Sequence, residues 1–152
     1  MVPLIILVTV TVAARAAGAL LGGDYLSSWP AATAVGLAAM FIVTGASHFV
    51  PARRAGFIAI VPPALTHPAA LVTTTGVLEL SGAAGLLIPI AEGALRTGAA
   101  WGLAALLVAM FPANVYASRS RRSANSPHTP LARRTAMQCV FVAAALFVAL
   151  GS

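Results

Sequence analysis

Five stretches of the chain are apolar almost throughout and are separated by short breaks rich in Gly, Pro, Ser or charged residues. A helix that crosses a bilayer needs about 20 mainly apolar residues, and each stretch meets that length. The pattern predicts membrane spans at about residues 2–22, 31–50, 69–90, 95–117 and 133–151. We therefore expect an all-α fold, a polytopic transmembrane helical bundle that forms a single domain over residues 1–152.

The connection between the second and third spans departs from this simple pattern. It contains Pro51, Pro62, Pro63 and Pro68 around the apolar segment GFIAIV at 56–61. That segment is too short to span a membrane and too apolar to stay in water. We expect it to lie in the membrane interface or to fold back against the bundle, because irregular backbone at membrane depth needs protein cover.

Composition excludes a water-soluble globular domain. The chain is 60% hydrophobic and 8% charged, whereas soluble domains are about 45–50% apolar and about 25% charged. All nine basic residues are arginine, and seven of them flank or occupy the second and fourth connections: Arg53, Arg54, Arg119, Arg121, Arg122, Arg133 and Arg134.

This arginine bias predicts the orientation. Positive loops stay on the cytoplasmic side, so we expect a multi-pass protein of the inner (plasma) membrane with a cytoplasmic N-terminus and an external C-terminus. The basic stretch at 117–130 is then interpreted as a topology signal with some affinity for anionic lipid, and no nucleic-acid partner is expected. The first span resembles a signal peptide at ARAAGA (14–19), but no basic side chain precedes it, which favours a retained helix.

Each predicted span carries one conspicuous polar residue: Arg15, His48, Glu79, Asn114 and Gln138. At about 1.5 Å per residue, Glu79 lies roughly 15 Å and Arg15 roughly 20 Å from the cytoplasmic side. The other three lie within about one turn of that side. Glu79 shares its helix face with Thr75 and with small residues, so this face should point into the bundle.

These residues predict one polar pocket in the inner half of the bundle. Glu79 and His48 are the candidate acid–base pair, and Asn114, Gln138, Arg15 and Thr75 are candidate ligand-binding residues. Such a pocket could hold the head of a quinone-like ligand. Two structural alternatives remain open: an ion pair between Arg15 and Glu79 that locks two helices, and helix capping by His48 and Asn114.

Metal and disulfide chemistry find no support in the sequence. The chain has three His, three acidic residues and the single Cys139, spread along its length. No metal-ligand cluster is expected, and one thiol cannot form an internal disulfide.

Four motifs together resemble the DoxX-like family of small bacterial membrane proteins. They are GASHFVP (45–51), IVPPALTHP (60–68), LVTTTGVLELSGAAGLLIP (71–89) and GLAALLVAMFPANVY (102–116). The resemblance covers about residues 36–117, with a weaker match in PLARRTAMQ (130–138). It implies a four-helix core to which the first helix is added, and it places the family's histidine, glutamate and asparagine at His48, Glu79 and Asn114.

Three functions are compatible with these observations. The first, which the resemblance favours, is an accessory subunit of a quinone-linked oxidoreductase that binds a lipophilic ligand and a redox partner protein. The second is a stand-alone membrane enzyme that performs acid–base chemistry on a lipophilic small molecule with Glu79 and His48. The third is an assembly or interaction protein without chemistry, in which the polar residues only hold helices together.

Overall fold

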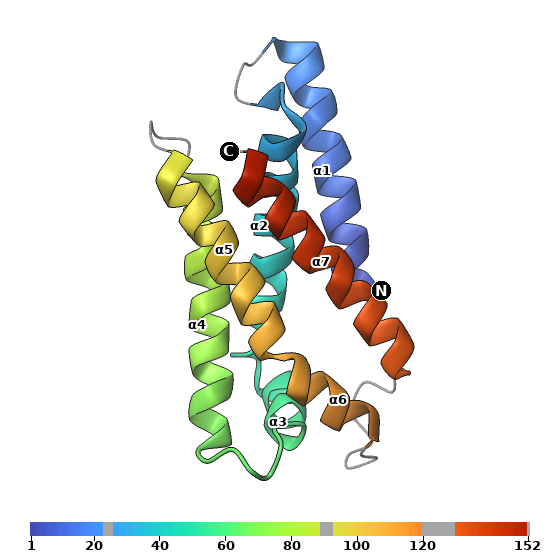
Figure 1. Ribbon diagram of the computed structural model, residues 1–152, viewed down its shortest axis with the longest axis vertical. Helices are drawn as coiled ribbons and strands as arrows, with labels where there is room; N and C mark the ends of the chain where they lie inside the picture. Colours follow the sequence, from blue (N-terminus) through green and yellow to red (C-terminus); the bar gives the residue numbers. More distant parts are fainter. Residues whose placement is uncertain (23–25, 89–92, 120–129, 152) are drawn as a thin grey trace.

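The computed structural model describes residues 1–22, 26–88, 93–119 and 130–151. Within these residues it is all-helical (Figure 1). The elements are α1 (Val2–Leu21), α2 (Trp29–Ser47), α3 (Pro51–Ala59), α4 (Pro68–Leu87), α5 (Gly93–Ala109), α6 (Phe111–Arg119) and α7 (Leu131–Gly151). Asp24, Glu92, Arg121, Arg122 and His128 lie outside the described residues.

Five helices or helix pairs are long and apolar enough to cross a membrane, which confirms the predicted fold class. They are Val2–Leu21, Trp29–Ser47, Pro68–Leu87, Ala94–Arg119 and Leu131–Gly151. Prolines in the first turn of α1, α2, α3 and α4 help to set where these helices begin, because the missing N–H is not needed there. The protein is therefore a polytopic membrane protein by helix length and hydropathy.

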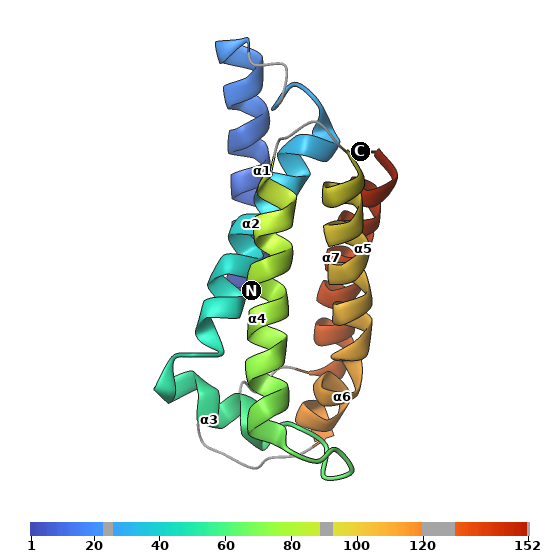
Figure 2. The same ribbon diagram turned by 90° about the vertical axis from the view of Figure 1, so that its left-hand side faces the viewer.

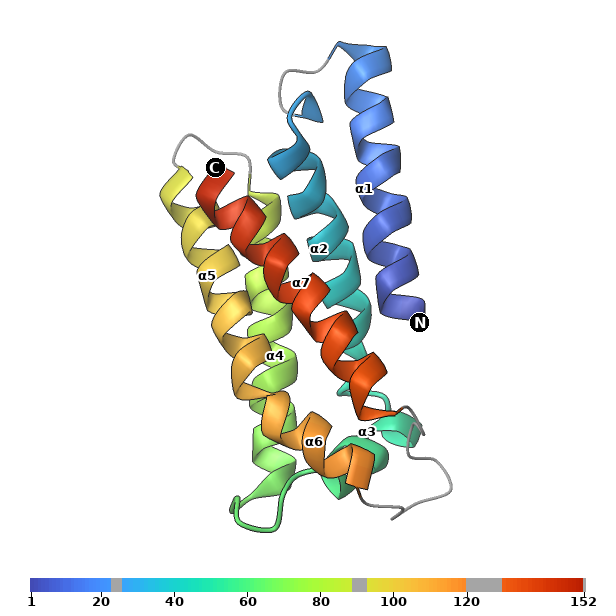
Figure 3. The ribbon, with the colours of Figure 1, turned by 45° about the vertical axis from the view of Figure 1, so that its right-hand side comes forward.

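The bundle has a core of four helices with α1 added on one side. Helix α2 packs against α1, α4 and α7, and α5 packs against α4 and α7. Helix α7 crosses obliquely between α5 and α2 (Figure 3). The core side chains are almost completely buried, and the largest are Leu37, Met40, Phe41, Leu86, Leu103 and Val148.

Glycines allow close approaches in the bundle. The sequence has two glycine pairs with GxxxG spacing, Gly18/Gly22 and Gly98/Gly102. Of these four, only Gly18 has a neighbouring segment so near that an added Cβ would meet it, at 2.5 Å from the Leu26 carbonyl oxygen. A Cβ added at Gly36 of α2 would lie 2.7 Å from the carbonyl oxygen of Leu7 in α1, so only glycine allows this contact. In contrast, a Cβ at Gly98 or Gly102 would meet nothing within 4 Å. The pair Gly98/Gly102 therefore does not mark close helix packing within this chain.

Two predicted spans are interrupted near prolines. Helix α2 ends at Ser47 rather than at residue 50, and α3 begins at Pro51. The fourth span breaks at Met110, two residues before Pro112, which has no N–H to continue the helical hydrogen bonds.

Helix α3 contains the first four residues of the apolar segment GFIAIV (56–61), which is too short to span a membrane. It lies at the end of the bundle where α4 begins and where α6 is found (Figure 2). None of its residues is fully buried, and it packs against α4. The second connection is thus largely helical and covers one end of α2 and α4.

Candidate functional site

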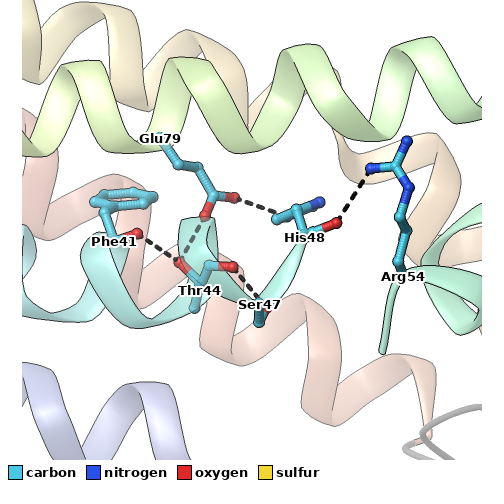
Figure 4. Close-up of polar contacts among 6 residues, drawn as sticks. All are labelled: Phe41, Thr44, Ser47, His48, Arg54 and Glu79. Atoms are coloured by element: carbon cyan, nitrogen blue, oxygen red, sulfur yellow. Dashed lines mark hydrogen bonds and ion pairs between the residues drawn. The ribbon is translucent and has the colours of Figure 1, made fainter. Parts of the chain in front are cut away.

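Glu79 lies inside the bundle, on the face of α4 that packs against α2. The residue is only 3% exposed. The Thr44 hydroxyl of α2 donates a hydrogen bond of 2.6 Å to Oε2, and His48 Nε2 lies 3.6 Å from Oε1 (Figure 4). The carboxylate is therefore held by two side chains of one neighbouring helix, one turn apart.

Two glycines allow these polar residues to meet. Gly45 of α2 faces Glu79, where an added Cβ would lie 3.1 Å from the Glu79 Cβ. Gly76 of α4 faces His48, where an added Cβ would lie 2.8 Å from the His48 Cβ. Each helix thus places a glycine opposite the polar residue of the other, so that their backbones come close enough for the side chains to pair.

The His48 ring contacts Phe57 and Glu79, but one of its two nitrogen atoms has no hydrogen-bond partner. It is the C-cap residue of α2 and is 6% exposed. Its ring stacks on Phe57 of α3, with centroids 4.5 Å apart and planes inclined by 21°. Nε2 faces Glu79, whereas the buried Nδ1 has no hydrogen-bond partner. A buried polar atom left unpaired costs about 1–3 kcal/mol, so Nδ1 is the atom of this site that calls for an explanation.

Arg54 holds α3 in place beneath His48. Its guanidinium donates to the His48 carbonyl at 3.2 Å, the Ala69 carbonyl at 3.0 Å and Thr73 Oγ1 at 2.8 Å. From the sequence, Arg54 was expected only to be part of the positively charged second connection. A signal that could have placed Arg54 on a helix is Pro51, because proline is favoured in the first turn of a helix.

Asn114 and Gln138 form a second polar cluster, carried by other helices. Asn114 Nδ2 of α6 donates to Gln138 Oε1 of α7 at 2.8 Å, and Arg134 donates to Asn114 Oδ1 at 3.3 Å. Gln138 Nε2 in turn donates to the Leu107 carbonyl of α5. That carbonyl lies next to the helix break before Pro112, so Gln138 supplies a partner to backbone near the break.

The predicted site residues do not form one pocket. They form two separate clusters, each with two of those residues. His48 and Glu79 meet between α2 and α4, and Asn114 and Gln138 meet between α6 and α7. Thr75 is half-buried on α4, one turn from Glu79, but the hydroxyl that binds the carboxylate is that of Thr44. Thr44 precedes His48 by four residues and therefore lies on the same face of α2.

Arg15 lies far from Glu79. Its guanidinium carbon sits 5.6 Å from the centre of the Trp29 ring, at the first residue of α2. Thr44 is fifteen residues further along α2, which corresponds to about 22 Å of helix. The alternative in which Arg15 pairs with Glu79 is therefore wrong, and Arg15 makes a cation–π contact instead.

A separate groove opens between α4 and α5. It has a volume of about 360 Å³ and is lined by small and apolar residues, among them Ser81, Gly82, Gly98 and Gly102. It presents no charged side chain among the residues that line it. It can accept an apolar chain but offers no acid–base chemistry.

Potential metal ligands do not cluster in the described part of the chain. Within residues 1–22, 26–88, 93–119 and 130–151, no three His, Cys, Asp or Glu residues gather as a metal site would require. Cys139 is a free, exposed cysteine on α7.

Comparison with known proteins gives one match. A family model described as Domain of unknown function (DUF8561) matches residues 37–149. No curated protein and no solved structure matches the chain. The matched range runs from the middle of α2 through α7 and includes both polar clusters, but it carries no DoxX assignment.

Proposed function

Because the chain belongs to the family described as Domain of unknown function (DUF8561), whose description gives no chemistry, we propose a function from the His48–Glu79 site itself. The proposal is that this membrane protein binds the polar head of a lipophilic, quinone-like ligand at His48. The observation that carries it is the buried His48 Nδ1 without a partner, on a ring whose other nitrogen faces Glu79.

The chemistry of an imidazole supports a ligand with an oxygen atom in the ring plane. The N–H or lone pair of an imidazole nitrogen lies in the ring plane, so a partner of Nδ1 must approach edge-on. Phe57 stacks on a face of the ring instead. A protonated Nδ1 donates to a carbonyl, and a bare Nδ1 accepts from a hydroxyl. The same atom therefore suits both a quinone and the corresponding quinol, and Glu79 is placed to balance the charge of the ring when both nitrogens carry protons.

The resemblance to the DoxX-like family supports the finer part of this proposal. We infer that the chain acts as an accessory subunit of a quinone-linked oxidoreductase and that a redox partner protein completes the reaction. The separate Asn114–Gln138 cluster is assigned a structural part in this account, because its hydrogen bonds connect α5, α6 and α7.

We also propose the orientation with a cytoplasmic N-terminus. Five of the seven arginines in the described residues lie on α3, at the end of α6 and at the start of α7: Arg53, Arg54, Arg119, Arg133 and Arg134. These segments occupy the same end of the bundle (Figure 1), which supports that end as the cytoplasmic one.

Ligand titration tests the binding proposal. The purified protein in phosphatidylcholine nanodiscs is titrated with decylubiquinone, and binding is followed by calorimetry. We expect His48→Gln to weaken binding by at least about tenfold, since it removes one buried hydrogen bond to the ligand.

The matched control is His67→Asn. His67 is exposed and has a positive φ of 58°, a conformation that asparagine tolerates. It should bind as the unchanged protein does. Absence of binding by the unchanged protein, or equal affinity in the His48→Gln variant, would overturn the proposal.

One observation favours a function without a ligand. The Thr44–Glu79 hydrogen bond and the facing glycines are also what an interhelical lock requires. In that case Glu79→Gln would lower thermal stability while no quinone binds. A stand-alone acid–base enzyme would use the same pair, and turnover of a lipophilic substrate that persists in a Glu79→Ala, His48→Ala double variant would exclude it.

A further inference from the structure

The end of the bundle that carries α3 combines exposed cations with exposed apolar side chains. Arg53 of α3 is exposed, and so are Phe49 and Val50 just before this helix, at 43% and 45%. An apolar side chain beside a cation is the arrangement found at the boundary between acyl chains and headgroups. The side chains at this end therefore suit a lipid interface better than water alone.

Two further arginines lie at the same end. Arg119 ends α6 and Arg133 lies in the first turn of α7, and both are exposed. The end of α6 and the start of α7 lie at the same end of the bundle as α3 (Figures 1 and 3). They differ from Arg54, whose guanidinium donates hydrogen bonds to three acceptors within the bundle. In the described ranges the acidic side chain is Glu79, which is buried against α2 and cannot neutralise them.

We propose that this end, formed by α3, the end of α6 and the start of α7, binds anionic phospholipid headgroups through Arg53, Arg119 and Arg133. Charge complementarity supports this occupant, because uncompensated guanidinium groups favour phosphate. The adjoining exposed Phe49 and Val50 favour a lipid over a nucleic acid or an acidic protein, since only a lipid also offers acyl chains. The proposal does not depend on what binds at His48.

The experiment measures lipid selectivity. The protein is reconstituted in phosphatidylcholine with spin-labelled phosphatidylglycerol or spin-labelled phosphatidylcholine as the probe, and the fraction of motionally restricted probe gives the relative association constants. We expect the unchanged protein to prefer phosphatidylglycerol. Each headgroup-bound arginine is worth about fivefold in affinity, so the Arg53→Gln, Arg119→Gln, Arg133→Gln variant should lose most of this preference.

The matched control replaces the same three residues with lysine. Lysine keeps the charge, so this variant should keep the phosphatidylglycerol preference, and added salt should reduce it. Thermal unfolding shows whether the glutamine variant is folded. If it is not, the single variants Arg53→Gln and Arg133→Gln take its place, each with an expected loss of about fivefold.

Two results would overturn the proposal. One is an equal phosphatidylglycerol preference in the unchanged protein and the folded glutamine variants. The other is no such preference in the unchanged protein; arginine-dependent retention of a single-stranded nucleic acid would then assign this end to a different partner.

Discussion

Thr44 on α2 and Glu79 on α4 share a hydrogen bond of 2.6 Å in the interior of the bundle. The same hydroxyl also lies 3.4 Å from the Phe41 carbonyl of its own helix. A hydroxyl has one proton, so it can donate to only one of these two oxygens at a time. The shorter contact selects the carboxylate, and Thr44 thereby fixes the position from which Glu79 faces His48.

Replacing Thr44 by the isosteric valine tests this bond. We expect Thr44→Val to lower the free energy of unfolding by about 1–2 kcal/mol, because a buried carboxylate oxygen loses its donor. Thr44→Ser should restore most of the loss. The control is Thr9→Val, since Thr9 is exposed and bonds only to backbone of its own helix α1. Unfolding in detergent micelles measures the difference, and equal losses in Thr44→Val and Thr9→Val would contradict the interpretation.

Gly76 is predicted to control the approach of α2 to α4. In Gly76→Ala the new Cβ would lie 2.8 Å from both the His48 Cβ and the Phe49 ring, so one of the helices must shift. We expect a loss of about 1–3 kcal/mol in unfolding free energy, typical of overpacking. Gly102→Ala is the control, because its Cβ meets nothing within 4 Å. An equally stable Gly76→Ala protein would show that the contact at His48 is not tight.

Gln138 is predicted to stabilise the break between α5 and α6. Gln138→Met has a similar size but leaves the Leu107 carbonyl and the Asn114 amide without this partner. We expect a loss of about 1–3 kcal/mol in unfolding free energy and faster hydrogen exchange in α6. Cys139→Ala, at the exposed next position, should change neither quantity. Unchanged exchange in α6 of the Gln138→Met protein would contradict the assignment.

The sequence predicts the five spans well because length and hydropathy are local properties. It predicts the ends less well, as at Ser47, where the helix stops three residues before the expected end. Proline effects explain this difference. The residue before a proline is biased away from helix, and α3 starts anew at Pro51 in another direction.

The sequence predicts the pairing of His48 with the Glu79 helix face but not the position of Arg15. The depth estimate assumed that all spans begin at one level. In the structure, α1 is displaced along α2, with Leu7 and Thr11 opposite Gly36 and Arg15 near Trp29. This offset depends on which small residues fit together between two helices, and hydropathy along one chain does not contain that information.

Nitrogen NMR of His48 tests the central claim most directly. The protein is labelled with ¹⁵N-histidine, and the signals of His48 are identified by their loss in His48→Gln. The account predicts that decylubiquinone shifts the His48 Nδ1 signal to a hydrogen-bonded value, while the signals of His67 and His128 stay unchanged. A His48 Nδ1 signal that does not move at saturating decylubiquinone would contradict the account.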